Sequence, residues 1–419
     1  MTIFSAVRHP SVRFILVTLV IDALGFGLVV PIIPPLVVHL SGESIASASL
    51  WVGALLAMFA LMQFFCSPIL GGLSDRFGRR PVLLLSLSGM CANYLLLAWA
   101  PSLAWLFLGR LIAGATAANA STANAYIADV TPPQLRAARF GLVGASFGIG
   151  FVVGPALGGV LGSYGLRIPF LVAAALAACN LLYGAFVLPE SLPPERRRTF
   201  DWSHANPWGS AHMVFVDPIL RRLALNWCCI WFALGALPSS FVLANTLRFG
   251  WDSRLNGIAL GVAGLASAIV QGLLVRRIVP YLGERRAAMT GALITMVGYF
   301  LQGIAPLPAF VFLGIGVQAL GAFGSAAVQA MVSASADPER QGETMGALSS
   351  LQGLTAIISP IVATALFTTF TEPGAPVMFP GAPFLASAVA CLVAAWAVMG
   401  LRSGVAPNVV AEIAQVEPK

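Results

Sequence analysis

The sequence predicts an all-α membrane protein whose twelve transmembrane helices form two six-helix halves related as a parallel repeat. Three observations lead to this fold class. First, 58% of the 419 residues are hydrophobic and only 9% are charged, whereas a soluble domain carries about 25% charged residues. Second, twelve apolar runs have the length of about 20 residues with which a helix crosses a bilayer. Third, glycine and proline recur with the same spacing in the two halves of the chain.

The apolar runs are continuous rather than alternating, which favours helices over barrel strands because a helix satisfies its backbone hydrogen bonds internally. The first run is too long for a signal peptide and has no small-residue processing site, so we expect it to insert without cleavage. In chain order, the expected spans cover residues 14–38, 50–73, 82–100, 103–127, 139–163, 166–188, 219–245, 256–278, 287–306, 308–331, 343–370 and 379–401.

The positive charges predict the orientation. Arg167, Arg248 and Arg254 fall in loops on one side, Arg110 lies within a span, and every other lysine or arginine falls on the side of the N-terminus. Such a bias places both termini in the cytoplasm of a multi-pass inner-membrane protein. The net charge of +7 is therefore a topology signal, and we expect no nucleic-acid partner.

Composition divides the chain into four parts. Residues 1–188 form the N-terminal six-helix half, and residues 218–402 form the C-terminal half. Between them, residues 189–217 are rich in proline and arginine, as in "PESLPPERRRTF", and are expected to form a cytoplasmic loop. Residues 403–419 form a cytoplasmic tail.

A repeat relates the two halves at an offset of 205 residues, without a gap. Because glycine and proline mark backbone geometry, the halves are expected to place turns and close helix contacts alike. Substrate sites of such repeats lie between the halves near the membrane midplane. The matching pairs are Gly78 and Gly283, Pro101 and Pro306, Gly109 and Gly314, Pro133 and Pro338, Gly141 and Gly346, Gly148 and Gly353, and Pro155 and Pro360.

The loop between the second and third spans reads "GGLSDRFGRRPV". Its G-x-L-x-D-R-x-G-R-R spacing resembles the signature loop of the major facilitator superfamily (MFS), and the second half holds a weaker copy, "YLGERRAAM". On composition alone, these charges would only anchor a turn to the cytoplasmic face. The resemblance implies the MFS fold and a cytoplasmic gate in which Arg79 meets Asp129 at the end of the fourth span. The implied gate residues are Asp75, Arg76, Gly78, Arg79, Arg80 and Asp129.

The fifth span contains "GASFGIGFVVGPALGGVLG". Gly150, Gly154 and Gly158 recur every four residues, so one helix face is flat enough for a neighbouring backbone to approach closely. Together with Pro155 and Gly159, these glycines resemble the antiporter motif of the superfamily. That resemblance implies a bent, sealed fifth helix and export rather than import.

Two charged residues, Asp22 and Arg110, lie in the interior of the spans, away from the span ends. Asp22 is about 12 Å from its helix end at 1.5 Å per residue, and a charge in the bilayer core costs between ~3 and more than 10 kcal/mol. A carboxyl group that gains and loses a proton as its surroundings change can carry protons; the alternative is a structural aspartate. Arg110 could reach the outer interface. Its R-x-x-x-G pattern with Gly114, however, resembles the fourth-helix motif of the superfamily, which implies a cavity-facing arginine that supports proton coupling.

Over nearly its whole length the chain resembles the tetracycline/proton antiporter branch of the drug:proton antiporters, through stretches such as "VIDALGFGLVVPIIPPL", "GRLIAGA", "AYIAD", "VLPES" and "DPERQGETMGALSSL". The resemblance implies that Asp22 is the proton-coupling acid and Arg110 the buried arginine. The chain departs from this branch at three positions, where Asn93, Ser267 and Thr295 replace acidic or histidine partners. A metal-chelated tetracycline needs such partners, so the substrate stays open.

Polar and aromatic residues within the spans are candidates for the substrate cavity. Interhelical hydrogen bonding is the alternative for each polar residue. The candidates are Gln63, Asn119, Asn226, Gln271, Gln318, Phe59, Trp231 and Phe323.

The sequence therefore predicts a monomeric, proton-coupled efflux transporter of a small amphipathic compound, with the bilayer and protons as its other partners. With only Asp22 and Arg110 charged in the spans, a neutral or cationic lipophilic substrate fits better than a polyanion. No cofactor or metal is expected, because the six cysteines lie in spans without a ligand pattern. An exporter or facilitator of sugars or metabolites on the same fold is the alternative. A membrane enzyme is disfavoured, since all four histidines lie outside the spans.

Overall fold

The computed structural model describes residues 10–197, 200, 216–335, 341–375 and 377–401. Every regular element in these residues is helical, and twelve helical segments are long and apolar enough to cross a membrane. The predicted all-α fold with twelve spans is confirmed. The tail and most of the central loop lie outside the described residues, so their predicted roles stay predictions.

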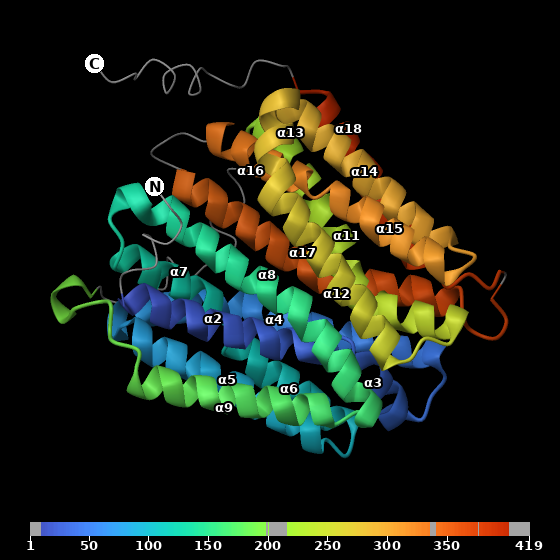
Figure 1. The fold of residues 1–419 in the computed structure, drawn as a ribbon, viewed down its shortest axis with the longest axis horizontal. Coiled ribbons are helices and arrows are strands. Elements are labelled where there is room, and N and C mark those ends of the chain that lie inside the picture. Colours follow the sequence, from blue (N-terminus) through green and yellow to red (C-terminus); the bar gives the residue numbers. More distant parts are fainter. Residues whose placement is uncertain (1–9, 198–199, 201–215, 336–340, 376, 402–419) are drawn as a thin grey trace.

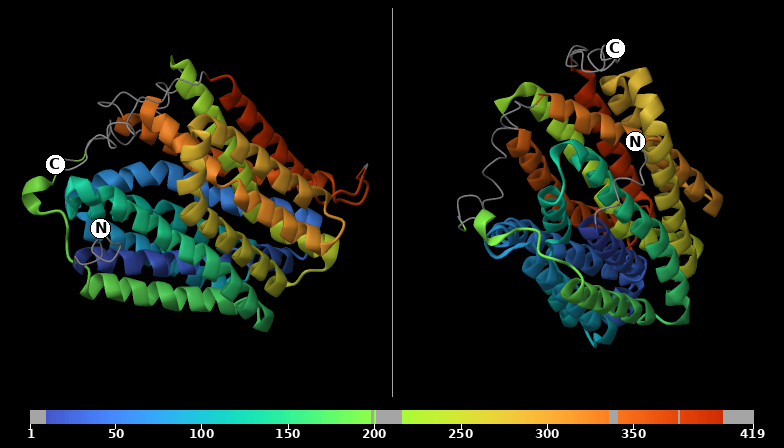
Figure 2. Two further views of the ribbon diagram at one scale, coloured as in Figure 1. Left: turned by 45° about the horizontal axis from the view of Figure 1, so that its top comes forward. Right: turned by 60° about the vertical axis from the view of Figure 1, so that its left-hand side comes forward.

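Two bundles of helices lie side by side, one from each half of the chain (Figures 1 and 2). The first bundle contains α2 (Pro10–Val29), α3 (Ile33–Ser41), α4 (Ile45–Phe77), α5 (Arg79–Trp99), α6 (Leu103–Ala115), α7 (Asn119–Asp129), α8 (Pro133–Tyr164) and α9 (Ile168–Phe186), followed by the short 3₁₀ helix η1 (Pro194–Arg196). The second contains α11 (Pro218–Phe249), α12 (Ser253–Ile269), the π-helical η3 (Val270–Leu274), α13 (Val275–Leu282), α14 (Glu284–Ile304), α15 (Pro308–Leu320), α16 (Phe323–Ser335), α17 (Gln341–Thr369) and α18 (Ala382–Met399).

Consecutive spans alternate in direction, so their turns fall on two faces. The Gly78 face holds the start of α2, the end of α18 and the turns at Gly78 and Gly283. The Gly42 face holds the turns at Gly42, Gly165 and Gly250. Gly78 and Gly283 have φ angles of 107° and 75°, a backbone region that favours glycine, which explains why this pair recurs in the repeat.

The helix boundaries confirm the repeat. Helix α14 begins and ends 205 residues after α5, and α15 begins and ends 205 residues after α6. A Cβ atom on Gly109 would meet Asn93 and Leu97 of α5, and one on Gly314 would meet the equivalent Gly298 and Gln302 of α14. The same pair of helices therefore packs through the same positions in both halves.

Three spans differ from their prediction. The first, expected over residues 14–38, is interrupted at residues 30–32 between α2 and α3, where Pro31 interrupts the helix, and the fourth span of each half is also broken. In the fourth spans, one break separates α6 from α7 at residues 116–118, and the other separates α15 from α16 at residues 321–322. At the break after α6, the Thr116 hydroxyl donates to the Ile112 carbonyl oxygen at 2.8 Å, a local bond that competes with the helical ladder. Non-helical backbone at membrane depth is tolerated only where protein or a cavity surrounds it.

The two halves contact each other toward the Gly42 face. The Ser49 hydroxyl of α4 lies 2.7 Å from the Thr368 hydroxyl of α17, which donates to the Ala46 carbonyl oxygen at 3.0 Å. A second contact joins α8 to α12, where Gly159 and Gly257 pack backbone to backbone. In Figure 1, α3, the end of α8 and the start of α12 lie together at this end of the molecule.

Candidate functional site

A cavity of about 180 Å³ lies between the two halves. Helices α2, α3, α4, α5 and α6 supply one wall, and α11 and α17 supply Gly235, Pro238, Ala356 and Pro360 to the other. Most lining residues are apolar. The polar lining groups are Gln63, Tyr94 and Arg110. Such an apolar cavity with a few polar groups, shared between two halves, is typical of a small-molecule site.

Arg110 lines this cavity. Only 5% of the residue is exposed, and its guanidinium carbon lies 5.9 Å from the centre of the Phe59 ring. Gly114, one turn further along α6, makes this approach possible: a Cβ atom there would lie 2.5 Å from the Phe59 carbonyl oxygen of α4. The R-x-x-x-G spacing thus places the arginine over an aromatic ring.

Asp22 lies next to the cavity but does not line it. Its carboxylate is beside the Asn119 side chain at the start of α7. Tyr94 interacts electrostatically with both Asp22 and Arg110. A Cβ atom on Gly25, one turn along α2 from Asp22, would lie 3.3 Å from the Tyr94 hydroxyl oxygen. Among the described residues, Asp22 and Arg110 do not form an ion pair with each other.

The structure brings only some of the predicted cavity residues together. Phe59 and Gln63 line the cavity, and Asn119 lies beside Asp22. Asn226 donates to the Ala394 carbonyl oxygen at 2.8 Å, and Gln318 accepts a hydrogen bond from Gln302 at 2.8 Å, so both make interhelical bonds.

The remaining candidates also lie elsewhere. Phe323 is packed in the core of the second half, Trp231 packs against Trp227 with ring centres 5.9 Å apart, and Gln271 is exposed within η3. The three departures from the tetracycline branch do not line the cavity either; these are Asn93, Ser267 and Thr295.

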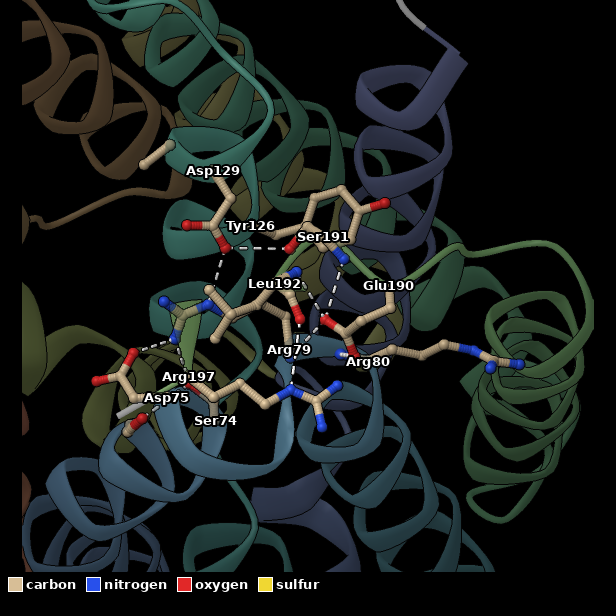
Figure 3. A network of polar contacts seen from close by, with 12 residues as sticks. Ser74, Asp75, Arg79, Arg80, Tyr126, Asp129, Glu190, Ser191, Leu192 and Arg197 are labelled. Carbon is tan, nitrogen blue, oxygen red and sulfur yellow. Dashed lines mark hydrogen bonds and ion pairs between the residues drawn. The ribbon is translucent and has the colours of Figure 1, made fainter. Parts of the chain in front are cut away.

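A second site is the charged loop at the Gly78 face (Figure 3). Arg79 donates to Asp75 at 2.5 Å, to the Ser74 hydroxyl at 2.7 Å and to Asp129 at 3.0 Å. Asp129 also accepts a hydrogen bond from the Ser191 hydroxyl at 3.1 Å. The contact between Arg79 and Asp129 that the family resemblance implied is therefore present. The three side chains that accept hydrogen bonds from Arg79 all belong to the first half.

Among the other predicted gate residues, Arg76 is exposed and lies over the Phe77 ring, with its guanidinium carbon 5.1 Å from the ring centre. Arg80 donates to the Ala185 carbonyl oxygen at the end of α9. Neither residue contacts the second half through these bonds, so the loop fixes the ends of α4, α5, α7 and α9 to one another.

Sequence reasoning missed Glu190, which follows α9. Its carboxylate accepts hydrogen bonds from the backbone N–H groups of Arg79 at 2.8 Å and Arg80 at 3.2 Å, the first residues of α5. These groups have no partner within the helix, and a negative charge at a helix N-terminus is stabilising. A Cβ atom on Gly78 would overlap this carboxylate, which is a second reason for glycine there. The sequence shows Glu190 in "VLPES", but it does not show that the start of α5 is its hydrogen-bond partner.

The glycine motif of α8 contacts two helices rather than one. A Cβ atom on Gly154 would lie 2.6 Å from the Gly27 Cα atom of α2, and Gly150 and Gly158 face the same helix. Gly159 faces the other way, where its Cβ atom would lie 2.8 Å from the Gly257 Cα atom of α12. Helix α8 is therefore wedged between its own half and the opposite half.

Comparison with known proteins identifies the family to which this two-bundle fold belongs. The family model of the Major Facilitator Superfamily matches residues 15–282 and 277–417. The chain belongs to the major facilitator superfamily. With its twelve apolar helices and its bacterial relatives, this chain is a multi-pass inner-membrane protein that acts on small molecules, and it is a transporter rather than an enzyme.

Relatives of this MFS transporter include a tetracycline resistance protein of class C from Escherichia coli, which is 40% identical over 84% of this chain and 88% of its own length. The solved human organic anion transporter MFSD10 (TETRAN) is 26% identical, with a TM-score of 0.69 over 93% of this chain and 99% of its own. A bacterial homologue of the human lysosomal transporter Spinster, inward-facing and unoccupied, is 17% identical and covers 93% of this chain and 95% of its own, with a TM-score of 0.74. At 17% identity, the similarity to the Spinster homologue shows a shared fold and nothing about the substrate.

The cap at the start of α5 leads to a prediction for this MFS transporter. Replacing Glu190 with alanine removes the acceptor for the backbone N–H groups of Arg79 and Arg80, and losing a cap costs about 1 kcal/mol. We expect a lower melting temperature of the purified protein by intrinsic fluorescence. Glu195→Ala, at an exposed position in η1, is the control. An equal loss in both variants would contradict a capping role.

Proposed function

We propose that this MFS transporter exports a small amphipathic compound in exchange for protons. The observation that carries the proposal is the position of Asp22, the one carboxylate within the membrane part of α2, which lies beside Asn119. Tyr94 interacts electrostatically with Asp22 and also with the cavity residue Arg110. A carboxyl group there can exchange its proton when the cavity changes the side to which it opens. The names of two similar proteins, a tetracycline resistance protein and an organic anion transporter, favour a drug-like or amphipathic organic substrate.

Alternating access fits the contacts between the halves. These contacts involve Ser49, Thr368, Gly159 and Gly257, all toward the Gly42 face. The excess of arginine on the other face favours a cytoplasmic Gly78 face and cytoplasmic termini. In this reading the structure is closed toward the outside, and transport requires the halves to separate along α4–α17 and α8–α12 while they close around the charged loop. Arg79 and its partners then act as the cytoplasmic gate.

The proposal is tested in inside-out membrane vesicles with an acidic lumen, in which a pH-sensitive dye reports proton release when tetracycline, cationic dyes or sugars are added. We expect the wild type to release protons with at least one drug or dye, and Asp22→Asn to release none. The control is Glu43→Gln, which removes an exposed carboxylate near the Gly42 turn and should behave like the wild type.

Three outcomes would contradict the proposal. Proton release that persists in Asp22→Asn would place the coupling site elsewhere. Substrate movement without a proton signal in either protein would indicate a facilitator. A response to sugars alone would favour the metabolite exporter.

A further inference from the structure

Arg110 differs from the other arginines near or within the spans. Arg248 donates to the carbonyl oxygens of Gln302, Gly303 and Ala305 at 2.7 to 2.9 Å, so its guanidinium caps the carbonyl groups at the C-terminal end of α14. Arg139 likewise donates to the Thr131 hydroxyl at 2.9 Å. For Arg110, no hydrogen bond or ion pair joins the guanidinium to another residue of the described chain, and its Nε and Nη2 atoms are buried without a partner.

In the described part of the chain, no carboxylate forms an ion pair with Arg110. The cavity that it lines is otherwise apolar or neutral, with Gln63 and Tyr94 as the other polar groups. Asp22 is not part of the lining and does not pair with it. A buried charge without a partner is strongly unfavourable, so an unpaired guanidinium at a cavity wall is a site for an anion. Its planar fork of donors matches a carboxylate or sulfonate with two parallel hydrogen bonds.

We propose that Arg110 is the anchoring residue of a subsite for the acidic group of an amphipathic organic monoanion. The apolar part of this ligand lies against Phe26, Phe59 and Met90, which line the same cavity. Arg110 is the only cationic residue that lines the cavity in the described chain. We therefore expect a ligand with one negatively charged group. The inference rests on the proposed function, because it takes this cavity to be the substrate site. It differs from the expectation of a neutral or cationic substrate, which rested on Asp22 and Arg110 as the charged residues of the spans.

The test measures binding to the full-length purified protein in lipid nanodiscs by titration calorimetry at neutral pH, without any gradient. Three probes share one ring system and differ in charge: 2-naphthoate, 2-naphthamide and 2-naphthylmethylammonium. We expect the wild type to bind 2-naphthoate at least tenfold tighter than the other two. Arg110→Gln should weaken 2-naphthoate binding by roughly 10- to 100-fold, the range for a lost charge-assisted hydrogen bond, and leave 2-naphthamide binding unchanged.

The matched control is Arg254→Gln, which removes an exposed arginine near the Gly42 face and should bind all three probes like the wild type. If Arg110→Gln does not fold, Arg110→Lys carries the test: it keeps the charge but loses the fork, so the preference for 2-naphthoate over 2-naphthamide should fall yet remain above one. The proposal is overturned if wild-type protein does not bind 2-naphthoate, if 2-naphthamide or the cation binds as tightly, or if neither Arg110 variant changes the preference.

This experiment is independent of proton coupling. Arg110-dependent binding of 2-naphthoate together with normal proton release in Asp22→Asn would reject antiport through Asp22 and keep the anion subsite. Loss of proton release in Asp22→Asn together with equal binding of all three probes would keep antiport and reject the subsite.

Discussion

Replacing Gly158 with valine is expected to destabilise the first half strongly. A Cβ atom at this position would lie closer than 3.0 Å to three backbone atoms of Leu28, so α2 and α8 would have to move apart at this contact. Overpacking of this kind costs about 1–3 kcal/mol and sometimes more. Because backbone atoms cannot turn aside as a flexible side chain does, we expect a value at or above the upper end.

The measurement is the melting temperature and the monodisperse yield of the purified variant. The control is Gly148→Ala in the same helix, where an added Cβ would meet nothing within 4 Å. There the higher helix propensity of alanine, about 0.5–1 kcal/mol, should leave the melting temperature unchanged or slightly raised. Equal behaviour of the two variants would show that close packing of α8 against α2 does not hold the fold.

Arg79→Gln is expected to give the second large loss of stability. The Arg79 side chain is 11% exposed and its partner Asp129 is 20% exposed, so removing the cation leaves a largely buried carboxylate without its counter-charge. Breaking such a pair costs about 3 kcal/mol or more. The Ser74 hydroxyl and Asp75 lose the same donor, which loosens the junction of α4 with α5.

Thermal unfolding in nanodiscs checks this prediction against Arg76→Gln, which removes a neighbouring arginine of the same loop that is exposed and lies over the Phe77 ring. We expect a clear drop in melting temperature for Arg79→Gln and a small one for Arg76→Gln. If both variants melt like the wild type, the network around Arg79 contributes nothing to the stability of this conformation.

Much of the fold could be predicted from the sequence because lipid imposes strong constraints. Long apolar runs defined the spans, and the glycine and proline pairs defined the repeat, which the equal spacing of α5–α6 and α14–α15 reproduces. The breaks after α6 and α15 could not be seen in hydropathy. Alanine, threonine and glycine at residues 116–118 and 321–322 are as compatible with a helix in lipid as with a turn.

The candidate site was predictable only where spacing along the chain carried the information. The contact between Arg79 and Asp129 was predicted from a recognisable loop pattern. The contact of Glu190 with Arg79 was not, because the two residues are 111 positions apart in the sequence. The polar cavity candidates were harder, because a span that is apolar on every side does not show which face points inward. Asn226 and Gln318 accordingly found partners on neighbouring helices, and Arg110 was placed by the close approach of Gly114 to α4.

The glycines of α8 divide into two groups with different surroundings. Those toward the Gly42 face are in close backbone contact, whereas a Cβ atom on Gly141, Gly144 or Gly148, toward the Gly78 face, would meet nothing within 4 Å. Unpacked helical glycines cost about 0.5–1 kcal/mol each, and this conformation receives no contact in return. That cost is the same in every arrangement of the halves in which α8 stays helical, so it favours none of them. What the three glycines provide is a stretch of α8 without side chains, against which the backbone of another helix can pack closely without displacing any group.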